Sequence, residues 1–202
     1  MSEDYPVLAT ESIFTGNVIS VHLDHVQMSD ETVAAREVVD HPGAVGVVAL
    51  DDDGAIVLVN QYRHPVRARL DELPAGLLDV AGEPALLAAQ RELAEEASIT
   101  ATEWHVLVDL YTSPGMSNEA IRLFLARGLA AVGESDRFQP EHEELTLTVH
   151  RVKLDDAVAR VYAGELTNAA AVVGILAAAH SATTGWIGLR PADTPWPARP
   201  GH

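Results

Sequence analysis

An uninterrupted apolar segment, residues 44–50, is the feature that most constrains the fold. A strand with one face in water alternates apolar and polar side chains, whereas a strand covered on both faces is apolar throughout. The turn-forming sequence Asp51-Asp52-Asp53-Gly54 follows this segment, and a second strand-like segment covers residues 55–62. We therefore expect a central sheet that is covered on both of its faces.

A helix is predicted from about residue 84 to residue 98. Pro84 suits the first helical position, and Glu83 suits the positive N-terminal end of a helix. Leu86 and Leu93 share one apolar face. The other predicted strands are 104–111, 120–126 and 145–153, and the other predicted helices are 154–162 and 168–180.

The two ends of the chain differ from its middle. Residues 11–40 contain short strand-like runs, and the run at 17–27 alternates imperfectly, as a half-buried strand does. Prolines recur after residue 189. We predict a small β domain over residues 1–40, a main domain over 41–188, and a flexible tail over 189–202.

Charge and composition exclude several classes of protein. Thirteen basic and 30 acidic residues give a net charge of −17, which would repel nucleic acids and anionic membranes. The N-terminus is acidic, unlike a signal peptide, and the longest apolar run, residues 169–179, is too short to span a bilayer. Without cysteine there is no disulfide, thiol nucleophile or Cys-ligated zinc. We predict a cytoplasmic protein without nucleic-acid or membrane partners.

Three carboxylates crowd one part of the predicted helix. Glu92 and Glu96 are four residues apart and lie on one face, with Glu95 beside them. Such like charges repel and destabilise a helix, and only Arg91 is close enough in sequence to offset them. One interpretation is a solvated acidic face; the other is a site for a hard divalent cation such as Mg²⁺, which takes oxygen ligands.

Residues 76–99 resemble the Nudix box, in which Gly is followed after five residues by Glu and after seven more by Arg-Glu-apolar-any-Glu-Glu-any-Gly-apolar. The matching residues are Glu83, Arg91, Glu92, Leu93, Glu95, Glu96 and Ile99. There are two departures: the interval from Gly76 to Glu83 is one residue longer, and Ser98 replaces the glycine. Serine at a left-handed helix end is expected to cost about 1 kcal/mol or to shift that end.

The Nudix resemblance implies an α+β fold, an α/β/α sandwich with a mixed sheet, here preceded by the small antiparallel N-terminal domain. It also implies a hydrolase that depends on Mg²⁺, with Mn²⁺ as the alternative ion. The implied metal ligands are Glu92, Glu96, the carbonyl of Ala75 and Glu143, with Glu144 close behind. The implied candidates for the catalytic base are Glu141, Glu143, Glu144 and the box residue Glu95.

Segments outside the box resemble the ADP-ribose pyrophosphatase branch of the family. The resembling segments are Arg36-Glu37, Gln61-Tyr62-Arg63, Glu72-Leu73-Pro74-Ala75-Gly76, residues 113–119 and Asn168-Ala169-Ala170. The branch implies a homodimer that exchanges its N-terminal β domains. It further implies that Arg36 and Glu37 approach the adenosine, that Arg63 binds phosphate, and that Met116 and Glu119 line the terminal ribose. Gly115 is a further candidate for substrate binding.

The resemblance therefore implies hydrolysis of ADP-ribose to AMP and ribose 5-phosphate. Two alternatives stay open. One is a pyrophosphohydrolase acting on another nucleoside diphosphate sugar, because a fold does not fix a substrate. The other is a non-catalytic nucleotide sensor, although no DNA-recognition helix is visible in the first 40 residues.

Overall fold

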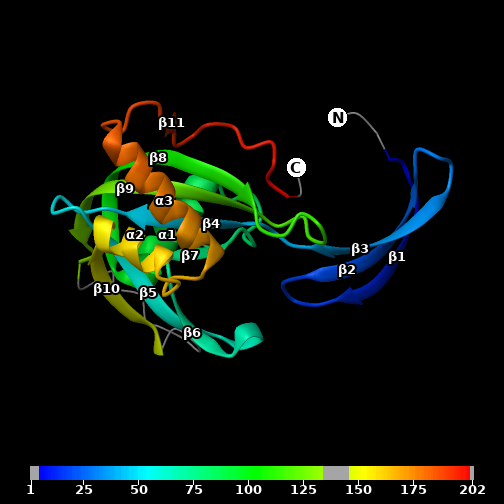
Figure 1. Cartoon of the computed structure of the whole chain (residues 1–202), viewed down its shortest axis with the longest axis horizontal. Coiled ribbons are helices and arrows are strands. Elements are labelled where there is room, and N and C mark those ends of the chain that lie inside the picture. The colour runs from blue at the N-terminus through cyan, green and yellow to red at the C-terminus, as the bar shows by residue number, and fades with distance from the viewer. Residues whose placement is uncertain (1–4, 134–145, 201–202) are drawn as a thin grey trace.

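The computed structural model describes residues 5–133 and 146–200. An antiparallel N-terminal sheet projects from one side of the main body (Figure 1). Its second strand pairs with both of the others over most of their length. The predicted N-terminal sheet is therefore confirmed. Its strands are β1 (Val7–Thr15), β2 (Ser20–Gln27) and β3 (Val33–Asp40).

The main body is built on a five-stranded mixed sheet in the order β11-β8-β9-β4-β7. Strand β4 is buried at every position, as its continuous apolar sequence predicts. It runs parallel to β9 and antiparallel to β7. The bounds are β4 (Ala44–Ala49), β7 (Ala75–Leu77), β8 (Ile99–Tyr111), β9 (Ala120–Ala131) and β11 (Arg190–Pro191).

A three-stranded antiparallel sheet, in the order β10-β5-β6, lies beside the first. Its members are β5 (Ala55–Arg63), β6 (Ala68–Glu72) and β10 (Thr148–Lys153), with a short 3₁₀ turn, η1 (His64–Val66), between β5 and β6. Strands β6 and β7 are missing from the sequence prediction. Three of the five residues of β6 are charged and β7 has only three residues, so neither carries a clear apolar pattern.

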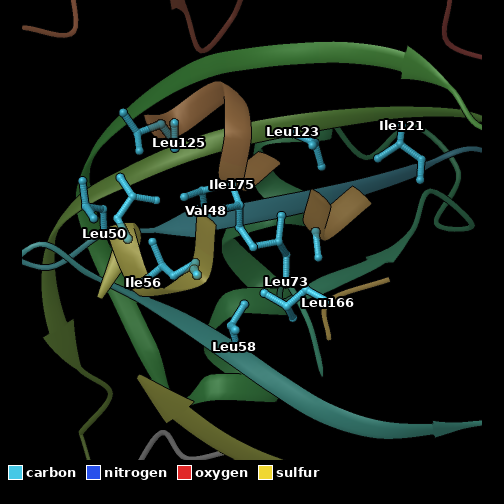
Figure 2. Packing of buried hydrophobic residues seen from close by; sticks show 14 of the residues in the cluster. Val48, Leu50, Ile56, Leu58, Leu73, Ile121, Leu123, Leu125, Leu166 and Ile175 are labelled. Atoms are coloured by element: carbon cyan, nitrogen blue, oxygen red, sulfur yellow. The ribbon is translucent and has the colours of Figure 1, made fainter. Parts of the chain in front are cut away.

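Side chains of the central sheet point alternately into two cores. Val45 and Val47 pack with Leu93 of α1 (Ala85–Ala97). Val48 on the opposite face packs with Ile175 of α3 (Ala169–Thr183), in the core drawn in Figure 2. Helix α2 (Leu154–Tyr162) contributes to this second core. Helices thus cover both faces of the central sheet, and the expected α/β/α sandwich is confirmed. Successive side chains of a strand point to opposite faces, so one apolar strand contributes to both cores.

The end of the chain differs from the predicted flexible tail. Residues 190 and 191 pair with β8, and Trp196 is buried against the core beneath α1. The guanidinium of Arg122, itself buried, donates a hydrogen bond of 2.6 Å to the carbonyl of Thr194 and lies 4.9 Å from the Trp196 ring centroid. Proline lacks an N–H but leaves its carbonyls available, so a buried arginine can fix a proline-rich segment.

No helix within the described part of the chain is long and apolar enough to cross a membrane.

Candidate functional site

Helix α1 places Glu92 and Glu96 against the loop that precedes it. The N–H of Ala75 donates a hydrogen bond of 2.9 Å to Glu96 Oε2. A Cβ atom added at Gly76 would lie 2.0 Å from Glu92 Oε1, so only glycine allows this approach. The two carboxylates and the backbone of residues 75–76 therefore form one compact group, as the box pattern predicts.

The electrostatics of this group favour a bound cation. The pKa of Glu96 is raised to about 8; burial is the largest cause and the charge of Glu92 adds to it, while the hydrogen bond from Ala75 and the charge of Arg63 oppose the shift. Burial also raises the pKa of Glu92, against the opposing effect of Arg91. Two adjacent carboxylates whose ionised forms are disfavoured are a functional-site signature rather than a stabilising feature.

Arg91 joins the remaining acidic side chains of the box. Its guanidinium lies 3.1 Å from Glu83, 2.7 Å from Glu92 and 3.1 Å from Glu95. The hydrogen bond with Glu83 is the largest cause of the raised pKa of Arg91. Arg91 thus offsets the acidic cluster, as the sequence suggests. Glu95, a candidate base, is held here by Arg91 at the edge of the cluster.

Ser98 answers the question raised by the missing glycine. The helix ends at Ala97, and Ser98 adopts the left-handed conformation with φ 54° and ψ 40°. Its N–H donates to the carbonyl of Ala94, and its own carbonyl accepts from Val132. The helix end is therefore not shifted, and serine occupies a conformation that glycine adopts more easily.

A cavity of about 450 Å³ opens beside Glu96 and contains several of the predicted residues. Arg63 reaches into it from the end of β5 and is held by Glu72, with Nη2 2.7 Å from Glu72 Oε2. Glu119 also lines the cavity, 3.7 Å from His41 Nε2. The lining also includes four residues from the segments that resemble the ADP-ribose pyrophosphatase branch: Gln61, Ala75, Gly76 and Asn168. Glu96 and Ala75 of the predicted metal group and the predicted phosphate-binding Arg63 therefore face one space.

The other predicted substrate residues lie in a second hollow. Arg36 and Glu37 of β3 line a space of about 420 Å³ together with Gly115 and Met116. The N–H of Val39 donates a hydrogen bond of 2.8 Å to the carbonyl of Met116, which fastens the N-terminal sheet to the 113–119 loop. The structure thus divides the predicted substrate residues between two hollows rather than gathering them in one.

Three predicted residues, Glu141, Glu143 and Glu144, lie outside the described residues, and their roles stay predictions. Over residues 5–133 and 146–200, no group of three or more His, Asp or Glu side chains is arranged to hold a metal ion. The described ligand group consists of Glu92 and Glu96, with Ala75 against them.

The donor chemistry of this group fits a hard divalent ion. Carboxylate and carbonyl oxygens are the ligands that Mg²⁺ and Mn²⁺ prefer, and Mg²⁺ needs only one or two carboxylates beside water and substrate phosphate. A cation between Glu92 and Glu96 would also offset the burial that raises their pKa values.

Sequence reasoning gave no role to Glu72 or Gln61, although both line the cavity. Glu72 is only 3% exposed and Gln61 9%, and they are two of the three buried polar or charged residues of the described chain. One signal in the sequence could have indicated Glu72: it directly precedes the apolar segment Leu-Pro-Ala, which favours burial. A buried carboxylate requires a hydrogen-bonding or charged partner.

Comparison with known proteins identifies the class to which this fold and site belong. A NUDIX domain model matches residues 40–170, and the chain belongs to the Nudix family. Nudix hydrolases generally use divalent metal ions.

Individual relatives extend the similarity beyond that domain. The ADP-ribose pyrophosphatase of Mycobacterium tuberculosis is 47% identical over 197 residues, covering 98% of this chain and 93% of the relative. That of Bacillus subtilis is 37% identical over 162 residues, covering 80% and 85% respectively. A crystal structure of an ADP compounds hydrolase has a TM-score of 0.75 at 20% identity, covering 90% of this chain and 96% of that one, and supports the fold alone.

Proposed function

We propose that this protein hydrolyses ADP-ribose to AMP and ribose 5-phosphate with the help of Mg²⁺. The observation that carries the proposal is the single cavity shared by Glu96 and Arg63. A diphosphate in this cavity would meet a site for a cation on one side and a guanidinium on the other. Similarity to ADP-ribose pyrophosphatases over nearly the whole chain supports the choice of substrate.

Each side chain then has a defined task. Glu92 and Glu96 would hold the metal ion, and the hydrogen bond from Ala75 fixes the orientation of Glu96. Arg63 binds a phosphate oxygen, for which the planar guanidinium is suited. When bound, a divalent ion withdraws charge from the diphosphate and lowers the pKa of a bound water. A carboxylate accepts the proton of the attacking water; Glu141, Glu143, Glu144 and Glu95 are the candidates.

A substrate comparison tests the proposal. Wild-type protein is incubated with ADP-ribose, GDP-mannose or NADH, with Mg²⁺, with Mn²⁺ or with EDTA, and the products are separated by chromatography. We expect AMP and ribose 5-phosphate from ADP-ribose, a higher kcat/KM than for the other substrates, and no turnover in EDTA. A higher kcat/KM for GDP-mannose or NADH would contradict ADP-ribose as the preferred substrate. No turnover of any of the three would favour the alternative of a non-catalytic nucleotide sensor.

We further propose that two chains pair through their N-terminal sheets. Strand β1 is exposed at each of its nine positions, including Ile13 and Phe14, which are 59% and 53% exposed. A three-stranded sheet that leaves apolar side chains exposed gains stability when another surface covers them. A second copy of this sheet would provide such a surface, and would bring the hollow lined by Arg36 and Glu37 to the boundary between subunits.

Light scattering after gel filtration tests the pairing. We expect the wild type at twice the chain mass of 21.6 kDa and the double variant I13D/F14D at the single mass. The matched control V66D/Y162D alters two apolar side chains that are 61% and 79% exposed on the main body. A wild type that elutes at the single mass at micromolar concentration would contradict the proposal.

A further inference from the structure

Glu72 is an unusual residue for its position. It ends β6 opposite Val59 of β5, and its side chain is 3% exposed beneath the cavity that contains Glu96. A carboxylate is almost never buried to this extent unless it is paired and hydrogen-bonded. Its partners should therefore reveal what this residue does.

Two residues of the neighbouring strand satisfy Glu72. Arg63 Nε lies 3.1 and 3.2 Å from the two carboxylate oxygens, and Arg63 Nη2 lies 2.7 Å from Oε2. Gln61 Nε2 donates a further hydrogen bond of 3.2 Å to Oε2. Bidentate contact of this kind fixes the plane of a guanidinium as well as its distance. Because Gln61 and Arg63 are two residues apart on β5, both side chains reach the same face of the sheet.

The pair is layered from the inside of the protein to the outside. The side chain of Arg63 is 44% exposed, whereas its partner is 3% exposed. The carboxylate therefore forms the base of the contact and the guanidinium faces the space above it. Glu72 belongs to β6, an edge strand of the sheet β10-β5-β6, and β6 pairs with β5 from Val59 to Arg63.

A second carboxylate faces the same space as Arg63. Glu96 lines the cavity together with Arg63 and Glu72. An arginine without a fixed partner would be drawn towards the Glu92–Glu96 pair, where it would displace the cation that this pair is suited to hold. Glu72 supplies the fixed partner.

We propose that Glu72 is a positioning residue that aims Arg63 at the diphosphate and keeps it away from the metal-binding carboxylates. The inference rests on the proposed function, because it takes Arg63 as the phosphate contact. In this role Glu72 acts through Arg63 rather than by binding the substrate or the metal ion. Its effect on turnover should therefore pass entirely through Arg63.

A double-mutant cycle tests this dependence. We compare kcat and KM for ADP-ribose in the wild type, E72Q, R63A and E72Q/R63A. Glutamine keeps the shape of Glu72 but removes the charge that holds the guanidinium. We expect E72Q to lower kcat/KM about 10-fold or more, mainly through KM, and to have less than a two-fold effect when Arg63 is already alanine. E165Q is the control, since Glu165 pairs with Arg160 at 3.3 Å on the exposed surface.

The outcomes separate this inference from the proposed function. Absence of ADP-ribose turnover by the wild type contradicts the proposed function. If the wild type is active and E72Q lowers kcat/KM by the same factor with Arg63 and with alanine at position 63, the positioning role is overturned. Melting curves are recorded for every variant. E72D keeps the charge on a shorter side chain, and the same double-mutant cycle is carried out with E72D where E72Q is unfolded at the assay temperature. We expect E72D to recover part of the lost kcat/KM, whereas equal losses in E72D and E72Q would also overturn it.

Discussion

Two clusters of charge in this molecule have opposite electrostatics. In the first, Arg122 lies between Asp109 of the neighbouring strand and the C-terminal segment, and Arg190 contacts the same carboxylate at 2.7 Å. Burial alone would raise the pKa of Asp109, but hydrogen bonds from the two arginines outweigh it and hold that pKa below its usual value. In the second, burial raises the pKa of Glu96 to about 8.

The difference separates a cluster that satisfies its own charges (the structural cluster) from the one that we propose to bind a metal ion (the functional cluster). Where carboxylate and guanidinium charges match, both groups are satisfied by the protein itself and the ionised state is favoured. Where carboxylates are buried together without enough positive charge, the protein carries a cost that a ligand can remove. The direction of the pKa shift therefore agrees with the cation site proposed at Glu92 and Glu96.

The largest expected effect concerns the structural cluster. Arg122 is 2% exposed, and its removal leaves two backbone carbonyls without this donor and Asp109 with Arg190 as its remaining arginine partner. We expect R122M to lower the free energy of unfolding by about 3–5 kcal/mol, as breaking a buried ion pair does. Urea denaturation measures it. R127M on the same strand is the control, because Arg127 only lies over the Trp186 ring at 5.5 Å. Equal losses of unfolding free energy in R122M and R127M would contradict a special structural role for the Arg122 cluster.

The functional cluster should respond in the opposite way. We expect E96Q to lower kcat at least ~100-fold, as loss of a metal ligand can, while its free energy of unfolding in EDTA stays within about 0.5 kcal/mol of the wild type. Glutamine resembles the protonated carboxyl, which the buried site favours at neutral pH.

Steady-state assays and denaturation measure both properties of E96Q, with E103Q, an exposed carboxylate of β8, as the control. Adding Mg²⁺ should raise the melting temperature of the wild type more than that of E96Q, because an ion that binds the native state stabilises it. Near-normal turnover of E96Q would contradict its role as a ligand.

Acid should expose the structural cluster. The pKa of Asp109 is lower in the folded protein than its ordinary value of 3.8. Its contribution to stability is therefore present above about pH 4 and is lost as the pH falls through the folded-state pKa. We expect the difference in unfolding free energy between wild type and D109N to be constant from pH 7 to about pH 5 and to shrink below about pH 4. Chemical denaturation at each pH measures it, and a difference that grows on acidification would reverse the assignment.

Sequence patterns predicted these regions unequally. The continuous apolar run at 44–50 predicted a sheet covered on both faces, helical periodicity predicted α1, and the four-residue spacing predicted the pair Glu92–Glu96, since these depend on local patterns; the sandwich itself was implied by the resemblance to the Nudix box. The partnership of Arg63 with Glu72, and that of Arg122 with Thr194, join residues that are brought together only by sheet pairing or by the returning chain end. No local pattern encodes such contacts. The proline-rich end looked flexible because its anchor, Arg122, is 72 residues away.

The smallest expected effect concerns Ser98. Helix α1 has two sources of instability, the backbone strain at Ser98 and the buried charge at Glu96, and a substitution of Ser98 tests the first without the second. Its φ of 54° places a serine where glycine is unstrained. We expect S98G to raise the free energy of unfolding by about 1 kcal/mol, or roughly 2–4 °C in melting temperature, and to leave kcat and the dependence on Mg²⁺ unchanged. S98A, which keeps a Cβ, should match the wild type. A change in metal dependence in S98G would mean that the helix end and the carboxylate pair are coupled, and that the cost at Glu96 is not electrostatic alone.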